Sequence, residues 1–358
     1  MSPGSSEQAH KNAAVPLVVD VDGSLLRGDL VTEGLLRLFA ESPARLLAVP
    51  FRLAGGRAPL KRWLARQTGT LPAATLVLNP AVLAEIDAAK AAGREVWLAS
   101  GSDELVVAPL AREVGATGCF ASDGRTNLVG HTKAAVLVGQ FGEHGFDYIG
   151  NERRDLAVWQ RARRAIGVNL SARLAQRVKA LDQQARFLSG ISGTTIDVIR
   201  ALRPRQWLAN ALVFVPVIAA PEAHAGHYLV AAGAGAALSA CAASRCIVED
   251  LLNLPNDRKG AGKQKQPMAA GKTPLPSMIG VASALAAGGF ALAFWLAPAL
   301  GLGVLLYALL GLCYLLWLRQ IKPAGAFARA LFNVFPLVVG AAVVRAPWSL
   351  RLLGFWEH

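Results

Sequence analysis

The hydrophobic and polar positions divide the chain into two parts. Before about residue 200, apolar and charged residues alternate over short distances, as they do in a water-soluble domain. Beyond it charge nearly vanishes, because Leu208–Ser244 carries only the formal charge of Glu222 and Met278–Leu318 carries none. About 20 helical residues cross the hydrocarbon core of a membrane, so uncharged apolar stretches of this length predict membrane spans. We therefore expect a multi-domain protein with a soluble N-terminal part and a membrane-embedded C-terminal part.

The N-terminal part alternates strand-like and helix-like segments. The apolar runs VPLVVD and EVWLAS lead into Asp, Gly and Ser residues, which is typical of buried parallel strands that end at a site. The stretch NPAVLAEIDAAKAAGR between them has an Asn-Pro start and a Gly stop, as a helix does. This alternation predicts a doubly wound α/β domain, whose ligands lie at the carboxyl ends of the strands. We expect a disordered tail at 1–14, the α/β domain at 15–168 with a helical cap insert at about 28–85, and a linker helix at 169–200.

The C-terminal part, residues 201–358, is predicted to be an all-α polytopic membrane domain with about five spans. The mean hydropathy of the chain, +0.38, agrees with a membrane protein. Pro298 and the glycines that follow it divide the longest apolar run into two helices. The predicted spans are 207–221, 227–247, 279–297, 301–318 and 328–345.

The positive charges give this domain an orientation. Lys and Arg residues lie before the first span, between the second and third, and between the fourth and fifth, whereas the loops near 222–226 and 298–300 have none. By the positive-inside rule, the basic segments face the cytoplasm. We therefore expect a multi-pass protein of the cell (inner) membrane whose N-terminal domain and 248–277 loop are cytoplasmic.

The formal net charge of +13 changes this picture little. Basic cytoplasmic loops account for such a charge in a membrane protein. The chain has no zinc-ligand spacing, RNA-binding motif or basic stripe with interleaved aromatic residues, so we expect no nucleic-acid partner. The four cysteines form no CxxC pattern, and we interpret them as small buried hydrophobic residues.

Polar residues with phosphoryl-transfer chemistry follow the predicted strands. Asp20 and Asp22, in DVDGS, leave the first strand two residues apart, where two carboxylates can share a magnesium ion and take different roles. One can attack phosphorus as a nucleophile while the other handles protons. Ser100 ends the second strand and can donate a hydrogen bond to a phosphoryl oxygen, and Lys133 supplies a cation. The DxDG motif alone is weak evidence for this chemistry, since Asp-Gly is also common in turns, and the other residues strengthen it.

Asn151 and Asp155 follow a later strand and are possible metal ligands of the hard-oxygen type. The motifs in this order resemble those of the haloacid dehalogenase-like phosphohydrolases over residues 15–168. Asn151 stands where that family often has Asp, which should weaken magnesium binding, and a domain that keeps the fold without turnover is the alternative. The resemblance implies Asp20 as the nucleophile that forms an aspartyl-phosphate, Asp22 as general acid and base, Ser100 and Lys133 as phosphoryl-holding groups, and Asp20, Asn151 and Asp155 as metal ligands.

A polar segment, VEDLLNLPNDRKGAGKQKQPMAAGKTP, interrupts the apolar runs at Val248–Pro274. Topology explains its bases but not its acids, because Asp250 and Asp257 have the spacing of one helical face together with Asn253. Such a face can bind magnesium, which in turn holds a diphosphate, and the bases that follow can pair with phosphate oxygens. A solvated loop is the alternative interpretation.

With LRPRQWLANALVFVP before the first span, this segment resembles the UbiA-type membrane prenyltransferases, in the decaprenyl-phosphate phosphoribosyltransferase-like branch. Members of that branch can carry a dehalogenase-like domain at the N-terminus. The resemblance implies a polyprenyl phosphate or diphosphate lipid as partner, Mg²⁺ as cofactor, Asp250 and Asp257 as its ligands, and Asn210, Arg258 and Lys263 as substrate-binding residues.

Several positions depart from that family's pattern. The chain stops after about five spans where the family usually has about nine, so we expect a truncated membrane part that has lost polar groups. Pairing with a second copy would cover the pocket wall left open to lipid, which makes a homo-oligomer one expectation. The departures are Ala209 for Lys, Glu249 for Asn, Asn253 for Asp, Gly260 for His, Gln266 for Arg and Gly325 for Asp.

Three functional hypotheses follow. The first is a UbiA-like membrane transferase that moves a prenyl or polyprenyl-phosphate-linked group with magnesium, fused to a dehalogenase-like phosphohydrolase domain. The second is a membrane-anchored phosphatase whose UbiA-like part is an inactive lipid-binding anchor. The third is a protein with neither activity, so whether the chain is an enzyme stays open at this point.

Overall fold

The computed structural model describes residues 15–260, 263–318 and 321–345. The chain forms two compact units. Unit 1 comprises the described residues of Met1–Gly193 and Leu254–Pro274, and unit 2 comprises those of Thr194–Asn253 and Leu275–His358. The tail expected at 1–14 lies outside the described residues.

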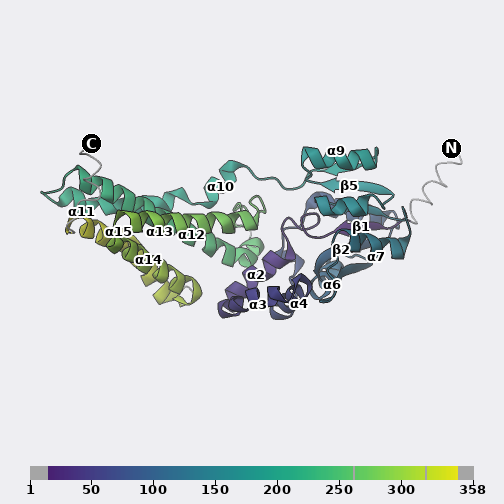
Figure 1. The fold of residues 1–358 in the computed structure, drawn as a ribbon, viewed down its shortest axis with the longest axis horizontal. Helices are drawn as coiled ribbons and strands as arrows, with labels where there is room; N and C mark the ends of the chain where they lie inside the picture. The colour runs from purple at the N-terminus through teal and green to yellow at the C-terminus, as the bar shows by residue number, and fades with distance from the viewer. Residues whose placement is uncertain (1–14, 261–262, 319–320, 346–358) are drawn as a thin grey trace. The chain divides into compact units, whose positions relative to one another are not determined.

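Unit 1 contains a six-stranded sheet in the order β3-β2-β1-β4-β5-β6, and every neighbouring pair is parallel (Figure 1). The chain builds outwards from β1 in both directions, so the topological switch point lies between β1 and β4. The doubly wound α/β class predicted from the sequence is confirmed. The strands are β1 (Leu17–Asp20), β2 (Val96–Asp103), β3 (Gly118–Ser122), β4 (Asp147–Gly150), β5 (Arg164–Val168) and β6 (Arg186–Leu188).

Helices connect these strands, and their starts follow local capping rules. The Asn79 side chain accepts a hydrogen bond from the Ala81 N–H at 3.1 Å, and Pro80 is the first helical residue, as the Asn-Pro start predicts. Four α-helices lie between β1 and β2, and we call the first three, α2, α3 and α4, the cap helices because they lie within the insert expected at about 28–85. The helices of unit 1 are α2 (Leu30–Glu41), α3 (Val49–Ala54), α4 (Arg57–Thr68), α5 (Pro80–Ala91), α6 (Glu104–Glu113), α7 (His131–Phe141), α8 (Leu156–Trp159) and α9 (Ala172–Leu181), with short 3₁₀ turns η1 (Pro43–Ala48), η2 (Ala73–Thr75) and η3 (Arg153–Asp155).

Successive residues of β1 enter two different hydrophobic cores. Leu17 and Val19 pack in one cluster together with Ile86 of α5, whereas Val18 packs in the other together with Leu137 of α7. All four residues of β1 are buried. Because helices cover both faces of a parallel sheet, its central strand must be apolar on both sides, which explains the continuous run in the sequence.

Residues 169–200, where we expected a linker helix, contain a helix, a strand and a second helix. Helix α9 is followed by β6, which pairs in parallel with β5, and then by α10 (Thr195–Ala201). Strand β6 has only three residues, and Arg186 and Phe187 are exposed. A short exposed edge strand carries no apolar run, so the hydropathy pattern does not mark it.

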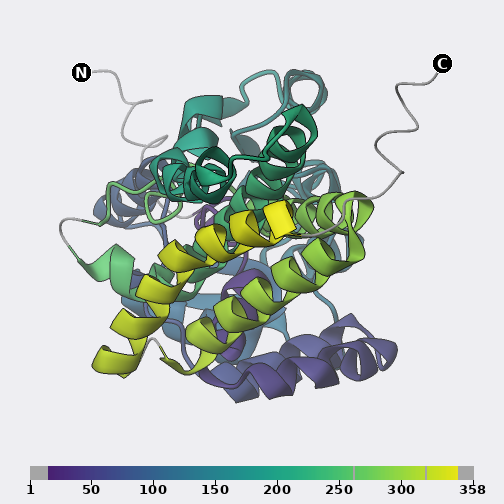
Figure 2. The same ribbon diagram turned by 90° about the vertical axis from the view of Figure 1, so that its left-hand side faces the viewer.

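Unit 2 is helical, and its helices pack side by side (Figures 1 and 2). Pro298 is the first residue of α14 and separates it from α13, as the sequence predicted. Helix α12 is longer than the roughly 20 residues that a span needs, and its last turns belong to unit 1. After α10, the helical segments are η4 (Pro204–Val213), α11 (Phe214–Ala219), α12 (Ala225–Lys259), α13 (Leu275–Leu296), α14 (Pro298–Leu316) and α15 (Lys322–Arg345).

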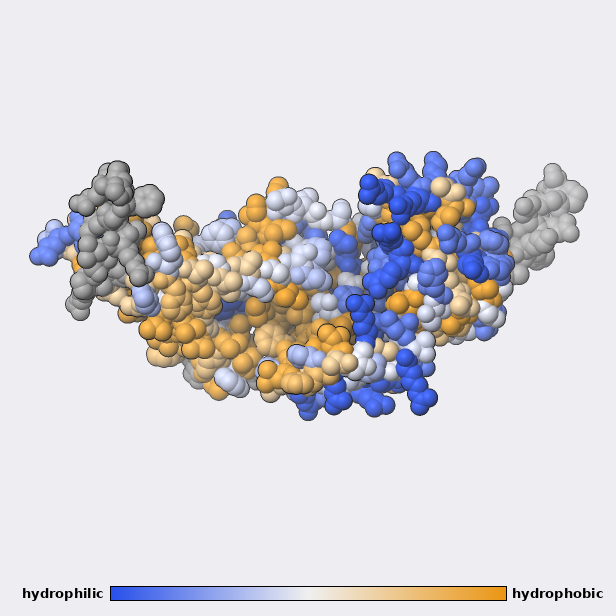
Figure 3. All heavy atoms as spheres, viewed as in Figure 1, coloured by the Kyte–Doolittle hydropathy of each residue, from blue (hydrophilic) through white to orange (hydrophobic). Residues whose placement is uncertain are grey.

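Among the described residues, α12, α13 and α14 are long and apolar enough to cross a membrane. Two shorter apolar helical stretches cover Trp207–Ala219 and Ala330–Val344. Apolar residues cover most of the visible surface of unit 2 (Figure 3), and large side chains such as Trp295 and Leu306 are exposed on it. Contiguous exposed apolar surface on this scale requires a hydrocarbon environment, which a bilayer provides. The chain is therefore a membrane protein.

Candidate functional site

Asp20 is the last residue of β1, at the switch point of the sheet, and it is buried. Lys133, from the first turn of α7, reaches it with its Nζ atom 2.5 Å from Asp20 Oδ1. The same ammonium donates to the Tyr148 hydroxyl at 3.1 Å and to the Ala99 carbonyl at 3.3 Å. The structure thus brings together the two residues predicted to be the nucleophile and the phosphate-binding cation.

Asp22 lies two residues beyond the strand and is held from three sides. Its Oδ1 accepts the N–H of Leu30 at 2.9 Å, and its Oδ2 accepts the hydroxyls of Ser100 and Ser102 at 2.8 Å each. Gly23 follows at φ +86°, a left-handed conformation that favours glycine. The turn therefore fixes the second carboxylate, and Ser100, expected to donate to a phosphoryl oxygen, donates to Asp22 here.

Asp155 and Asn151 complete the set at the end of β4. Asp155 Oδ1 accepts the Tyr148 hydroxyl at 2.8 Å, and Oδ2 accepts the backbone N–H groups of Asn151 and Glu152 at 3.0 Å. With its amide nitrogen facing the first strand, the Asn151 side chain donates to Asp20 Oδ2 at 3.3 Å and to the Asp22 carbonyl at 3.2 Å. All six residues predicted for this site therefore gather at one edge of the sheet.

Burial controls the charges of this site. It raises the pKa of Asp20 to about 8, although the neighbouring Lys133 ammonium opposes the rise. Burial alone would lower the pKa of Lys133, but the charges of Asp20 and Asp155 outweigh it and raise that pKa. An ionised Asp20, the form that can attack phosphorus, therefore depends on positive charge close by.

The donor set suits a magnesium ion. Asp20 Oδ2 and the Asp22 carbonyl converge on the same Asn151 amide nitrogen, so the Asn151 side chain would have to turn its oxygen towards them to become a third ligand. Carboxylate, amide and carbonyl oxygens are the ligands that magnesium prefers. Within the described residues, no group of three or more His, Cys, Asp or Glu side chains is placed to hold a metal, so Asn151 and the backbone would have to contribute.

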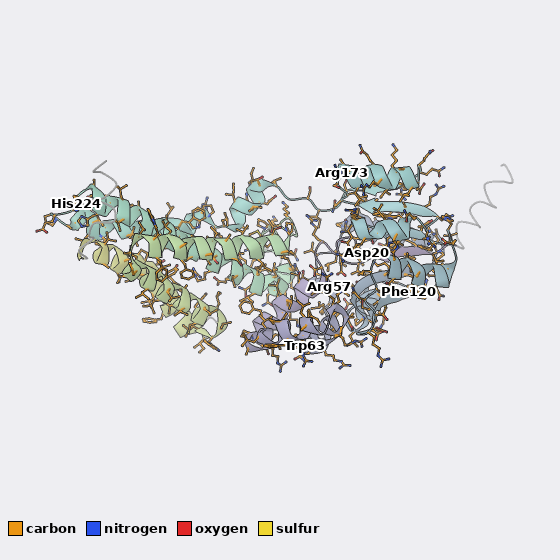
Figure 4. The ribbon with its side chains drawn as sticks, in the orientation of Figure 1. Asp20, Arg57, Trp63, Phe120, Arg173 and His224 are labelled. Atoms are coloured by element: carbon orange, nitrogen blue, oxygen red, sulfur yellow. The ribbon has the colours of Figure 1, made fainter. Side chains whose placement is uncertain are left out.

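A cavity of about 250 Å³ opens in front of these residues, and we call it the strand-end pocket. Asp20, Asp22, Lys133 and Asp155 line it, together with residues at the start of α2, in the cap helix α4, in β2, in the loop before α7 and in the turn after β4. Figure 4 marks Asp20 on the sheet and Arg57 on α4. The pocket volume is that of a small ligand.

A larger cavity of about 400 Å³ lies at the amino ends of the strands, away from this chemistry. Four of its charged residues form two ion pairs, Arg94 with Asp147 at 2.5 Å and Arg186 with Glu85 at 2.6 Å, and Arg164 pairs with Asp182 at 3.6 Å. Size alone therefore does not identify the functional cavity, because the carboxylates and the lysine described above converge only on the smaller one.

The predicted site residues of unit 2 have local partners. Asp250 forms an ion pair with Arg203, and Asn210 Nδ2 donates to the Ser239 hydroxyl at 3.1 Å. A partly buried network that the sequence analysis missed involves two residues on the same helix as Asp250. Arg245 is 3.3 Å from Glu249 Oε2, and it lies over the ring of Phe332 on α15, 4.5 Å from the ring centroid. An arginine inside the span expected at 227–247 was the signal for it.

The predicted site residues in the part of the polar segment that belongs to unit 1, Leu254–Pro274, are also paired. Lys263 Nζ lies 3.2 Å from Asp257 Oδ1. Arg258 donates to both carboxylate oxygens of Glu33 on α2, at 2.9 and 3.0 Å, and to the Thr75 carbonyl at 2.6 Å. Arg258, expected to bind substrate, is thus an anchor between this segment and the cap.

Comparison with known sequences finds one relative that matches nearly the whole chain and others that match only its membrane part. No family model matches the chain. An uncharacterized protein of Sinorhizobium fredii is 29% identical over 344 residues, covering 95% of this chain and 66% of its own length. The decaprenyl-phosphate phosphoribosyltransferase of Mycobacterium tuberculosis is 26% identical over 44% of this chain and 55% of its own length. That of Mycolicibacterium smegmatis is 28% identical over 44% of this chain and 52% of its own length. The chain thus spans about half to two thirds of the length of these relatives.

Solved structures match the N-terminal half. A protein of unknown function from Bordetella pertussis has a TM-score of 0.37 at 17% identity, covering 48% of this chain and 97% of its own. A probable phosphoserine phosphatase from Vibrio cholerae has a TM-score of 0.33 at 16% identity, covering 50% and 62%. The chain thus combines a doubly wound α/β unit with a membrane unit, and it is similar over 44% of its length to decaprenyl-phosphate phosphoribosyltransferases.

Proposed function

We propose that this protein is a membrane-bound phosphohydrolase whose active site is the strand-end pocket and whose substrates are phosphate monoesters. The observation that carries this proposal is the pair Asp20 and Lys133, 2.5 Å apart and buried at the switch point of the sheet. A buried carboxylate and a buried ammonium face a pocket beside a second, separately held carboxylate, Asp22. That combination suits covalent phosphoryl transfer better than a structural ion pair, which needs neither pocket nor second acid.

The reaction would proceed in two displacements. An oxygen of Asp20 forms a bond to phosphorus as the ester oxygen–phosphorus bond breaks, and Asp22 gives the leaving alkoxide a proton. Water then attacks the aspartyl-phosphate, Asp22 takes its proton, and inorganic phosphate leaves. Lys133 offsets the negative charge of the phosphoryl oxygens throughout. Magnesium, held by Asp20, Asn151, Asp155 and the Asp22 carbonyl, would supply further positive charge and align the phosphoryl group.

The test is hydrolysis of a phosphate monoester by the full chain in detergent with magnesium. We expect turnover by the wild type and a loss of at least about a thousandfold in Asp20→Asn, because the nucleophile is gone. Asp87→Asn is the matched control, since Asp87 is exposed on α5 and its carboxylate lies 3.6 Å from the Lys90 ammonium. Equal activity of Asp20→Asn and the wild type would sink the proposal.

We keep transfer to or from a polyprenyl phosphate lipid as a second candidate, in unit 2. The similarity to decaprenyl-phosphate phosphoribosyltransferases supports it. The pairing of Asp250 with Arg203 speaks against a free metal-binding carboxylate, so Arg203 would have to release Asp250. Magnesium-dependent labelling of decaprenyl phosphate from radiolabelled phosphoribosyl diphosphate, lost in Asp250→Asn, would establish it. An unlabelled lipid with the wild-type chain would leave unit 2 as an anchor.

We also propose that unit 1 faces the cytoplasm and that the membrane is the inner one, from the distribution of Lys and Arg. Lys263 and Lys265 in the polar segment should then be labelled by an amine reagent from the cytoplasmic side of inverted vesicles. Labelling only in right-side-out vesicles would reverse the orientation.

A further inference from the structure

Three basic side chains line the strand-end pocket and have no part in the proposed phosphoryl transfer. Arg57 and Lys61 come from the cap helix α4, and Arg154 comes from η3 after β4. We call them the cation trio. They come from two separate elements, so their meeting at one pocket is a product of the fold. Figure 4 shows where one of them, Arg57, lies on the cap relative to Asp20.

Lys61 is half-buried, and the groups it contacts do not neutralise it. Its Nζ donates to the Gly101 carbonyl at 2.6 Å and to Asn127 Oδ1 at 2.8 Å, both of which are uncharged. An ammonium has three N–H donors, so one remains for a ligand. Burial lowers the pKa of Lys61, Asp22 opposes this, and Arg154 and Arg57 lower it further. A desolvated cation of this kind is stabilised by an anion in the pocket.

The acids of the pocket already serve other roles. Asp29 caps α2 by accepting the N–H and hydroxyl of Thr32 at 2.7 and 2.6 Å. Glu152 lies 3.1 Å from Arg154 Nε, in a pair whose side chains are 45% and 57% exposed. Exposed pairs contribute little, and a guanidinium has five donors, so Arg154 retains donors for a ligand. Arg57 is exposed at the start of α4.

We propose that the pocket selects small phosphate monoesters whose leaving group carries a second anionic group, which the cation trio binds while Asp20 and Lys133 act on the phosphoryl group. This inference rests on the proposed function and narrows its substrate class. The volume of about 250 Å³ limits the leaving group to a few carbon atoms. A phosphate or a carboxylate can fill the second position, since guanidinium groups bind either through two parallel hydrogen bonds.

Three matched three-carbon esters test the inference with the full chain in detergent: propyl phosphate, propane-1,3-diyl bisphosphate and 3-phosphooxypropionate. We expect kcat/KM for one or both doubly anionic esters to exceed that for propyl phosphate by about tenfold or more, because hydrogen bonds between charged groups are stronger than those between neutral groups. The preferred ester identifies the second anion as phosphate or carboxylate. The advantage should shrink at high salt.

Substitutions assign the preference to the trio. Lys61→Met and Arg57→Met should each lower the ratio of kcat/KM for the preferred ester to that for propyl phosphate by about tenfold, whereas Lys61→Arg should keep most of it. Arg57 is exposed, so Arg57→Met should fold normally and still tests the inference if Lys61→Met does not fold. Arg66→Met, an exposed change on the same helix, is the matched control and should leave the ratio as in the wild type.

The outcomes separate this inference from the proposed function. Equal kcat/KM for all three esters, or an unchanged ratio in both Met variants, would overturn the inference and leave phosphohydrolase activity standing. If the chain hydrolysed none of the three esters, both the inference and the proposed phosphohydrolase function would be overturned.

Discussion

Replacing Arg258 by Met should destabilise unit 1 by about 3–5 kcal/mol, the cost of breaking a buried ion pair by removing one partner. Arg258 in the polar segment donates two hydrogen bonds to Glu33 on α2 and one to the Thr75 carbonyl of η2. The Arg258 and Glu33 side chains are 5% and 8% exposed, so solvent screens the pair little. Met keeps an unbranched apolar side chain but leaves the Glu33 carboxylate buried without its cation.

The assay is pulse proteolysis of the full chain in detergent at increasing urea concentrations, scored on cleavage within unit 1. Arg258→Met should lower the urea midpoint, and the double variant Arg258→Met, Glu33→Leu should regain much of the loss, because an apolar pair leaves no buried charge. Lys259→Met is the matched control, as Lys259 is exposed at the next position. A midpoint unchanged in Arg258→Met, or a double variant no better than the single one, would refute the anchoring role.

The pH dependence of this loss has a definite sign. Burial raises the pKa of Glu33 above its ordinary value of 4.5, and Arg258 opposes the rise. The folded protein therefore holds the Glu33 proton more tightly than the unfolded chain, and stability falls as the pH rises above about 4.5. Without Arg258 the pKa rises further, so the deficit of Arg258→Met should be small near pH 4.5 and grow towards neutral pH.

Three further changes test separate parts of the account. Asn151→Asp adds a carboxylate at the proposed magnesium site and should lower the magnesium concentration for half-maximal hydrolysis by about tenfold, which a magnesium titration measures. Gly101→Ala would place a methyl group 2.6 Å from the Val129 Cγ1 atom, so the pocket wall must shift and KM should rise while the fold persists. Tyr314→Phe removes a 3.1 Å hydrogen bond to Glu249 in unit 2 and should cost about 1 kcal/mol, seen as a lower thermal midpoint in detergent.

The strand ends of unit 1 could be predicted because their signals are local. The run before Asp20 and the run before Ser100 are apolar on both faces, which marks central parallel strands. Parallel strands end at one edge, so the polar residues after each run had to meet there. The separation of α13 from α14 at Pro298 was equally local, since proline cannot continue a helix.

The remaining contacts depend on residues far apart in the sequence. Arg258 and Glu33 are separated by 225 positions, and no spacing rule joins them. Lys61 escaped notice because one of its partners is the Gly101 backbone carbonyl, a group that every residue carries. Asp250 has the spacing of a metal ligand, but only the fold shows that Arg203 neutralises it. Sequence patterns thus located the candidate acids but could not predict which of them border a pocket.

The two units differ in the surroundings of their candidate catalytic carboxylates. In unit 1 the Asp20 carboxylate and the Lys133 ammonium border a pocket with Asp22 held beside them. In unit 2 the Asp250 carboxylate forms an ion pair with Arg203. Asp20 and Asp250 are both ion-paired, so the pocket and the separately held Asp22 are why we propose the activity for unit 1 and membrane attachment for unit 2.

The most direct test of that assignment is to trap the covalent intermediate. The full chain in detergent would be mixed with a phosphate monoester and magnesium, quenched in acid, and treated with borohydride, which reduces an aspartyl-phosphate to homoserine. Peptide mass spectrometry then locates the modified residue. The account predicts homoserine in place of Asp20 in the wild type and at no position in Asp20→Asn. Turnover of the ester with an unmodified Asp20, or with homoserine at another aspartate, would contradict it.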